Sequence, residues 1–299
     1  MIVAKIATRS QNRRVPPWVI VGCGYVGSAL AYRLEAAHHR VIATRRPTAD
    51  GDPYRIPPAS TAGGTAVVAV ELGDPKTLTG VIPAGAIVVC CAPPGPDPQG
   101  ETTALVDAAR TARRLIYISS TGVYPPAGGD WVDETWPVHP ATAAGRAREV
   151  AETVIATAPI SNIVLRVAGI HGSGRGLVDR IRSGTYRIIG DGRSHVSRIH
   201  IDDLVEAIVR AGASSVTGAV NIADDDPEQI GVVADAIASK LGLPSPPRVS
   251  ADSVDPEVAG MLTANRRIAN RRMKQELGVV LRYPSWRTIY DALTPRAGA

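Results

Sequence analysis

With 299 residues, 44% of them apolar, the chain can form one large α/β domain or two closely associated lobes, with a core that needs neither disulfides nor metal. Three cysteines, two of them adjacent, exclude a disulfide framework and predict a reducing, cytoplasmic location, and no apolar run is long enough to cross a membrane. The net charge of +5 comes mainly from scattered arginines, so we expect an anionic cofactor or substrate rather than nucleic acid.

The N-terminal residues 1–17 lack the apolar centre of a signal peptide and are expected to form a loose leader. An apolar strand at 19–21 then leads into a G-x-G-x-x-G turn, a helical pattern and a second strand at 41–46. In such a unit the first glycine permits the turn, the second lets the backbone approach a pyrophosphate, and the third lets helix and strand pack closely. The helix N-terminus offers N–H groups to the phosphates, so the unit predicts dinucleotide binding. The expected contacts are Gly22, Gly24, Tyr25, Val26 and Gly27.

The remaining first half alternates strands and helices. Strands are predicted at 66–72, 86–91, 115–119, 162–167 and 218–223, and helices at 101–113 and 142–157. Continuous apolar strands that alternate with helices predict a parallel sheet covered on both faces, with ligands bound beyond the carboxyl ends of its strands. We therefore predict a Rossmann-type doubly wound sheet over 18–165 and a smaller, interleaved C-terminal substrate lobe over 166–299.

Five segments together resemble the extended short-chain dehydrogenase/reductase superfamily, in its epimerase/dehydratase branch. They are the glycine turn, Leu72-Gly73-Asp74, and the segments 118–124, 165–172 and 190–203; the segment 270–278 also resembles the closing helix of that family. The resemblance implies an NAD(P)-dependent oxidoreductase or epimerase/dehydratase that acts on a sugar, nucleotide-sugar or other polyhydroxylated small molecule. It also implies a homodimer, and the alanine-, arginine-, glycine- and proline-rich composition is typical of a bacterial source.

The chain departs from the family at the acid/base pair. Family members place Tyr-x-x-x-Lys on the helix after the serine loop, and alignment on Pro140 puts Thr142 and Arg146 at those positions. A threonine hydroxyl titrates far above the pH range that suits proton transfer, whereas Arg146 could still hold the ribose or a phosphate. The chain is therefore identified as an atypical member.

Ser120 matches the catalytic serine of the superfamily, three residues before Val123, although a strand-end cap is the alternative. Proton transfer would fall to Tyr124, to His171 or to a water held by Thr142. Tyr124 could instead be a packing aromatic and His171 a structural residue. No spacing of histidine, cysteine and carboxylate residues indicates a metal site.

The end of the second strand indicates the cofactor. An acidic residue there would bind the ribose 2′-hydroxyl of NAD, but this chain has Arg45 and Arg46, which suit the 2′-phosphate of NADP. NADP is therefore expected, with NAD as the alternative. The resemblance also places four residues near the cofactor: Leu72, Asp74, Cys91 and Ala92. For Cys91 the alternative is a small buried apolar residue.

Four further arginines could contact substrate phosphates or be ordinary surface charges: Arg166, Arg175, Arg193 and Arg198. Two other functions also stay open at this point. The protein could be a catalytically silent NADP-binding regulator, or a non-redox lyase or isomerase on the same fold.

Overall fold

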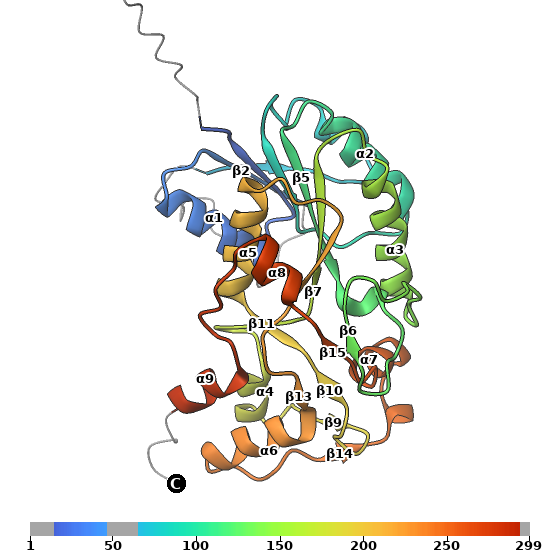
Figure 1. Cartoon of the computed structure of the whole chain (residues 1–299), viewed down its shortest axis with the longest axis vertical. Helices are drawn as coiled ribbons and strands as arrows, with labels where there is room; N and C mark the ends of the chain where they lie inside the picture. Colours follow the sequence, from blue (N-terminus) through green and yellow to red (C-terminus); the bar gives the residue numbers. More distant parts are fainter. Residues whose placement is uncertain (1–14, 47–64, 294–299) are drawn as a thin grey trace, which may run out of the picture.

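The structure, a computed structural model, describes residues 15–46 and 65–293 and is shown in Figure 1. Its centre is a seven-stranded parallel sheet in the order β12-β7-β5-β4-β1-β2-β3. The strands are β1 (Trp18–Val21), β2 (Val41–Arg45), β3 (Ala66–Ala69), β4 (Ile87–Cys90), β5 (Arg114–Ser120), β7 (Asn162–Val167) and β12 (Ala219–Ile222). This arrangement confirms the predicted Rossmann-type doubly wound sheet.

Helices cover both faces of the sheet (Figure 1). On one face lie α1 (Tyr25–Ala36), α5 (Ile201–Ala213) and α8 (Arg271–Glu276), and on the other lie α2 (Pro98–Ala108) and α3 (Ala143–Ala156). Side chains alternate between the faces of a strand, and β1 follows this rule: Trp18 and Ile20 pack with α1 and α5, whereas Val19 and Val21 pack with α2 and α3. Burial on both sides explains why the strands are continuously apolar.

A smaller lobe lies beyond the carboxyl ends of the strands (Figure 1). Its core is separate, and Ile188, Val233, Ile237 and Trp286 belong to it. Its elements are α4 (Leu177–Arg182), β9 (Ile188–Ile189), α6 (Ile230–Lys240), β14 (Arg248–Val249) and α9 (Trp286–Ala292).

Short strand pairs and turns connect the lobe to the sheet. The pairs are β8 (Gly169–His171) with β11 (Arg198–His200), β10 (His195–Val196) with β13 (Glu228–Gln229), and β6 (Trp131–Val132) with β15 (Arg267–Ile268). Helix α7 (Pro256–Leu262) and the single-turn helices η1 (Pro75–Leu78), η2 (Thr121–Val123) and η3 (Ala251–Ser253) complete the described chain. Since β7 contains residue 165 and β12 follows it, the sheet itself spans the predicted domain boundary.

Some predicted boundaries differ from the structure. Helix α2 begins at Pro98, ahead of the predicted Glu101, because Asp97 caps it by accepting a hydrogen bond from the Gly100 N–H at 3.0 Å. Strand β3 ends at Ala69 rather than Leu72. Most of the predicted leader, residues 1–14, and the predicted loop at 47–64 lie outside the described residues.

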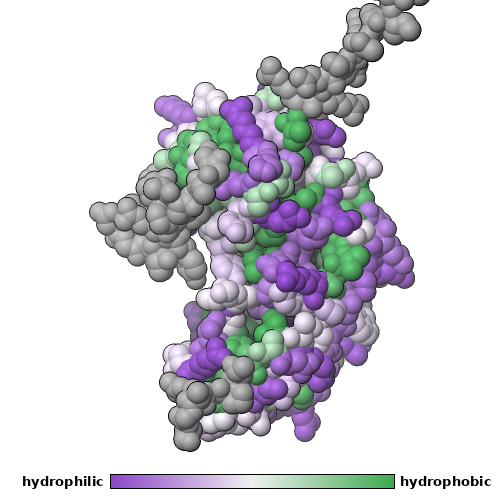
Figure 2. Space-filling model, turned by 90° about the vertical axis from the view of Figure 1, so that its left-hand side faces the viewer, coloured by the Kyte–Doolittle hydropathy of each residue, from purple (hydrophilic) through white to green (hydrophobic). Residues whose placement is uncertain are grey.

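On the face shown in Figure 2, hydrophilic and hydrophobic residues are interspersed. Among the helices of the described chain, none combines the length and the apolar character needed to cross a bilayer.

A buried ion pair joins α3 to the sheet. The Arg166 side chain on β7 donates to the carboxylate of Glu152 on α3 through Nε and Nη2, and the Nη2–Oε2 distance is 2.8 Å. Both residues are less than 9% exposed. The Ser119 hydroxyl donates to the same carboxylate, so β5, β7 and α3 meet at one charged group.

We expect Arg166→Leu to lower the free energy of unfolding by about 3–5 kcal/mol, because it leaves the Glu152 carboxylate buried without a cation. The double variant Glu152→Leu/Arg166→Leu should recover much of this loss. Urea denaturation measures both values. Arg248→Leu is the control: it removes a pair with Asp235 whose side chains are 43% and 40% exposed, and it should cost about 0–1 kcal/mol. Equal losses in the single and double variants would contradict the assignment.

Candidate functional site

The glycine turn lies between β1 and α1, where the sheet order reverses direction between β1 and β4. Gly22 has a φ of +91°, and a Cβ there would lie 2.6 Å from the backbone nitrogen of Ala92, in the loop after β4. A Cβ on Gly27 would lie 2.6 Å from the Gly22 carbonyl oxygen. The turn and the close helix packing therefore require these two glycines.

Gly24 is different, because no atom of the described chain lies within 4 Å of the position that its Cβ would take. The residue is exposed, and no side chain caps the first turn of α1. Packing within the protein does not explain a glycine here, whereas close approach of a pyrophosphate to the helix N-terminus does. The residues present therefore fit a dinucleotide.

The glycine-rich loop after β8 lies against this turn. The Tyr25 hydroxyl donates to the Ser173 carbonyl at 3.2 Å, and the Arg175 guanidinium lies 5.3 Å from the centre of the Tyr25 ring. The predicted cofactor residues Tyr25 and Val26 are both half-buried. Segments about 150 residues apart in sequence thus meet at the N-terminus of α1, beyond the carboxyl ends of the central strands.

The other predicted cofactor residues lie at or just after the carboxyl ends of β2 and β3. Arg45 ends β2 half-buried, and Arg46 follows it fully exposed. Asp74 is exposed and caps η1 by accepting a hydrogen bond from the Lys76 N–H at 3.1 Å, while Leu72 packs against the α2 and α3 side of the core.

Two hydrogen bonds from backbone N–H groups fix the loop after β4. Cys91 donates its N–H to the Val21 carbonyl at 2.7 Å, and the Gly95 N–H donates to the Glu101 carboxylate at 2.7 Å. Burial raises the pKa of the Cys91 thiol well above its usual range, so the side chain is a neutral, half-buried group in this loop. The small apolar interpretation of Cys91 fits this environment.

Ser120 ends β5 and is half-buried. Its Oγ accepts a hydrogen bond from the Gly122 N–H at 3.0 Å, so it caps η2 and can still donate its hydroxyl proton to another group. The loop is held against α3, because a Cβ on Gly145 would lie 2.6 Å from the Gly122 carbonyl oxygen.

Thr142 and Arg146, the expected replacements for the family pair, both make local contacts at the start of α3. Thr142 Oγ1 caps α3 by accepting a hydrogen bond from the Gly145 N–H at 3.1 Å. Helix α7 covers this end of α3, where the Ala143 N–H donates to the Glu257 carboxylate at 2.7 Å. Arg146 is exposed and donates to the Ala141 carbonyl at 3.2 Å, within its own turn.

Arg148, which the alignment missed, points toward the sheet. Its Nη1 donates to the Ile118 carbonyl near the end of β5 at 2.9 Å, and its charge lowers the pKa of the neighbouring Cys90 thiol against the larger, opposite effect of burial. Two residues along α3 therefore separate the solvent-facing arginine from the one at the strand ends. A helical-face analysis around Ala151 and Ile155, both fully buried, could have found it.

Tyr124 is the other predicted acid that the structure places in a structural role. It is 0% exposed, its hydroxyl donates to the Asn221 side chain at 2.8 Å, and it accepts from Arg166 at 3.0 Å. Burial raises the pKa of the Tyr124 hydroxyl above its usual value. A substrate therefore cannot reach this hydroxyl, and the alternative of a packing aromatic is the correct interpretation.

His171 lies in the predicted loop region, at the end of β8. Its ring meets the His200 ring edge to face, with 5.3 Å between the ring centres. The His200 ring in turn packs on the Tyr283 ring, with 3.7 Å between the centres. Burial lowers the pKa of His171 to about 4, with the His200 and Arg198 charges adding to the effect. At neutral pH the imidazole is therefore uncharged and a weak base.

The predicted phosphate-contacting arginines divide into several environments. Arg166 is fully used in its buried ion pair, and Arg193 is exposed beside Asp191 at 3.7 Å. Arg198 is buried next to Asp224, whose pKa burial raises to about 7. Neither the Nη2 of Arg198 nor the Asp224 carboxylate has a hydrogen-bond partner in the described chain.

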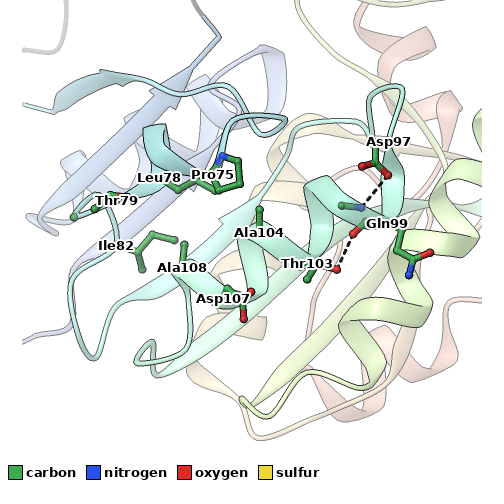
Figure 3. A pocket seen from close by; sticks show the side chains of 12 residues that line it. Pro75, Leu78, Thr79, Ile82, Asp97, Gln99, Thr103, Ala104, Asp107 and Ala108 are labelled. Carbon is green, nitrogen blue, oxygen red and sulfur yellow. Dashed lines mark hydrogen bonds between the residues drawn. The ribbon is translucent and has the colours of Figure 1, made fainter.

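A cavity of about 670 Å³ lies elsewhere, between η1 and α2 (Figure 3). Leu78 and Ile82 form an apolar part of its lining, and Asp97, Thr103 and Asp107 a polar part. No residue predicted for the site lines this cavity.

Comparison with known proteins places these features in context. The sequence profile of the NAD dependent epimerase/dehydratase family matches residues 18–223. A 3-diazoavenalumate denitrifying reductase from Streptomyces is 33% identical over 205 residues, which are 62% of this chain and 67% of the other.

Solved structures agree on the fold. A conserved protein of unknown function from Silicibacter pomeroyi is 30% identical, with a TM-score of 0.77 over 93% of this chain and 98% of that one. A dTDP-glucose 4,6-dehydratase from Bacillus anthracis, solved in complex with NAD, has a TM-score of 0.77 over 90% of this chain and 92% of that one. At 18% identity the second likeness shows the fold alone.

We expect Gly24→Ala to impair cofactor binding and Gly27→Ala to impair stability. Gly24→Ala should cost less than about 1 kcal/mol of stability but should weaken binding of NADPH at least about tenfold, because the added methyl occupies space that only the pyrophosphate uses. Gly27→Ala should lower the free energy of unfolding by about 1–3 kcal/mol, because its Cβ meets backbone. Thermal unfolding and fluorescence titration with NADPH measure the two effects. Unchanged NADPH affinity in Gly24→Ala would rule out the assigned role.

Proposed function

Because the chain belongs to the NAD-dependent epimerase/dehydratase family, we propose that it is an NADP-dependent reductase whose reaction needs no side-chain acid. As a member of this family it is an enzyme of nicotinamide-dependent oxidoreductase or epimerase/dehydratase type. The bound nicotinamide supplies or accepts the hydride. Our proposal concerns the direction of hydride transfer and the class of substrate. It is argued from the residues that were predicted to transfer protons.

The environments of the residues that were predicted to transfer protons support the proposal. Tyr124 is enclosed in the core, Thr142 is a helix cap under α7, and burial lowers the pKa of His171 to about 4. Oxidation of an alcohol, the first step on a sugar, must remove a hydroxyl proton and is helped by a base whose pKa lies near the working pH. These residues supply no such base and, for the reverse reaction, no acid to protonate a reduced carbonyl, which favours an electrophile whose reduction needs no proton transfer.

The reductase relative indicates one suitable class of electrophile. Its name describes removal of nitrogen from a diazo compound. Replacement of a diazonium group by hydrogen, Ar–N₂⁺ + H⁻ → Ar–H + N₂, balances without a proton from any side chain. We propose an aryl diazonium or a similarly electron-poor small molecule as the substrate class.

A sugar or nucleotide-sugar substrate is the second candidate. It is favoured by the position of Ser120, whose half-buried hydroxyl ends β5 and can donate to a substrate carbonyl or hydroxyl. A water molecule would then have to exchange the proton.

The remaining residues take roles around the cofactor. The glycine turn and the α1 N-terminus bind the pyrophosphate, and Arg45 and Arg46 suit the 2′-phosphate of NADP. Arg148 takes the ribose-binding role first expected of Arg146, because it is the α3 arginine that reaches the strand ends.

Turnover by the purified protein tests the reductase proposal. We expect oxidation of NADPH, followed at 340 nm, with an aryl diazonium salt, and faster turnover with NADPH than with NADH because no carboxylate ends β2. The panel should include dTDP-glucose, UDP-glucose and simple ketones, with product analysis for epimerised or dehydrated sugar. Tight NADPH binding without turnover of any compound would instead favour a silent regulator, and sugar conversion without diazonium reduction would favour the second candidate.

Arg148→Gln and Arg146→Gln form a matched pair on one helix. Arg148→Gln should weaken NADPH binding about 10- to 100-fold, the loss expected for one or two hydrogen bonds from a charged group. Arg146→Gln should leave binding within about twofold, because the Arg146 guanidinium contacts only its own turn. Fluorescence titration reads binding directly and does not depend on a known substrate. Equal effects of the two variants would contradict the proposed role of Arg148.

A further inference from the structure

Arg266 lies against the loop that carries Ser120, although 140 residues separate it from that loop in sequence. Its Nη1 donates to the backbone carbonyls of Tyr124 and Pro125, the second at 3.4 Å. The residue is half-buried and directly precedes β15. The C-terminal part of the chain thus brings a cation to the loop that follows β5 and η2.

The charge of Arg266 is not balanced within residues 15–46 and 65–293. No carboxylate there lies within ion-pair distance of it, whereas Arg166, Arg248 and Arg272 each pair with one. Burial lowers the pKa of Arg266 to about 10, against a smaller, opposite effect of the nearby Tyr124 hydroxyl. The group still carries a positive charge at neutral pH. A half-buried cation without a counter-ion costs free energy, so its presence calls for an anionic partner.

The donors of Arg266 are arranged for such a partner. Nη1 is used by the loop, while Nε and Nη2 make no hydrogen bond within the described chain. Neither nitrogen is among the buried, unpartnered polar atoms, so both remain accessible to solvent. The guanidinium is therefore anchored at one end, and it offers its remaining donors in the fork that binds carboxylate or phosphate well.

The backbone beside Arg266 is firmly held. Asn265 has a φ of +46°, in the left-handed region that asparagine tolerates better than most residues. Its Oδ1 accepts a hydrogen bond from the His195 N–H at 2.8 Å, and its carbonyl accepts from the Gly129 N–H at 2.7 Å. These contacts fix the position from which the Arg266 side chain extends.

We propose that Arg266 is the substrate's anion-binding residue, and that its free guanidinium edge holds an oxyanion, either a carboxylate or a phosphate, beside the Ser120 loop. The proposal rests on the proposed function in calling the anion part of the substrate. It adds to that function that the substrate carries an oxyanion in addition to its reacting group. A carboxylate would fit a small aromatic acid, and a phosphate would fit a nucleotide-linked substrate.

Calorimetric titration of the full chain with inorganic phosphate and, separately, with benzoate tests this site at about 0.1 M NaCl, where nonspecific attraction is screened. We expect one of the two anions to bind the wild type at least about tenfold more tightly than Arg266→Gln. Arg193→Gln is the control and should behave like the wild type, since Arg193 is 83% exposed beside Asp191. Preference for phosphate or for benzoate identifies the source of the oxyanion.

A second variant covers the case in which the first does not fold. If Arg266→Gln does not fold, Arg266→Lys replaces it, and it should bind the anion at least about threefold more weakly because an ammonium lacks the fork. Equal anion affinity in the wild type and the Arg266 variant, or no binding of either anion to the wild type, overturns the proposal. The titration contains neither cofactor nor hydride acceptor, so a failed turnover assay would remove the reductase assignment and leave this site standing.

Discussion

The ion pair between Glu152 and Arg166 is the interaction on which the rest of the site depends. It joins α3 to β7 in the core, and the Ser119 hydroxyl joins β5 to the same carboxylate. The Nη1 of Arg166 donates to the Tyr124 hydroxyl, which in turn donates to the Asn221 side chain on β12. A buried charge must be satisfied completely, so these strands and this helix have little freedom to shift against one another.

The same network determines which chemistry remains available. It uses the Tyr124 hydroxyl inside the core, and the backbone carbonyl of the same buried residue accepts a hydrogen bond from Arg266. The end of α3 is closed in turn by Glu257 of α7. The Ser120 hydroxyl ends β5, while Arg148 binds the Ile118 carbonyl before it and Arg266 binds the Tyr124 carbonyl after it. Such a site can orient an anionic, electron-poor molecule better than it can move a proton, which is the physical basis of the reductase proposal.

Local sequence signals predicted much of this architecture, and the failures have a common cause. The glycine turn and the apolar strands depend on neighbouring residues, so their positions could be read directly. Thr142 and Arg146 were assigned by spacing from Pro140, yet a shift of two residues turns a helical side chain by about 200°. Arg146 therefore faces solvent while Arg148 faces the strand ends. The helix was expected correctly, and its rotation about its own axis was not.

By itself, the sequence determined the parallel doubly wound sheet, the dinucleotide-binding turn and the residues that follow each strand, because strand pattern and glycine spacing are local and periodic. Only the tertiary structure decided which polar side chains face the site. Tyr124 became a core residue through partners 42 and 97 positions away in sequence, and Arg266 reached the serine loop from 142 positions away. The burial and charge of a side chain are set by what packs against it from distant elements, and short-range patterns carry no record of those contacts.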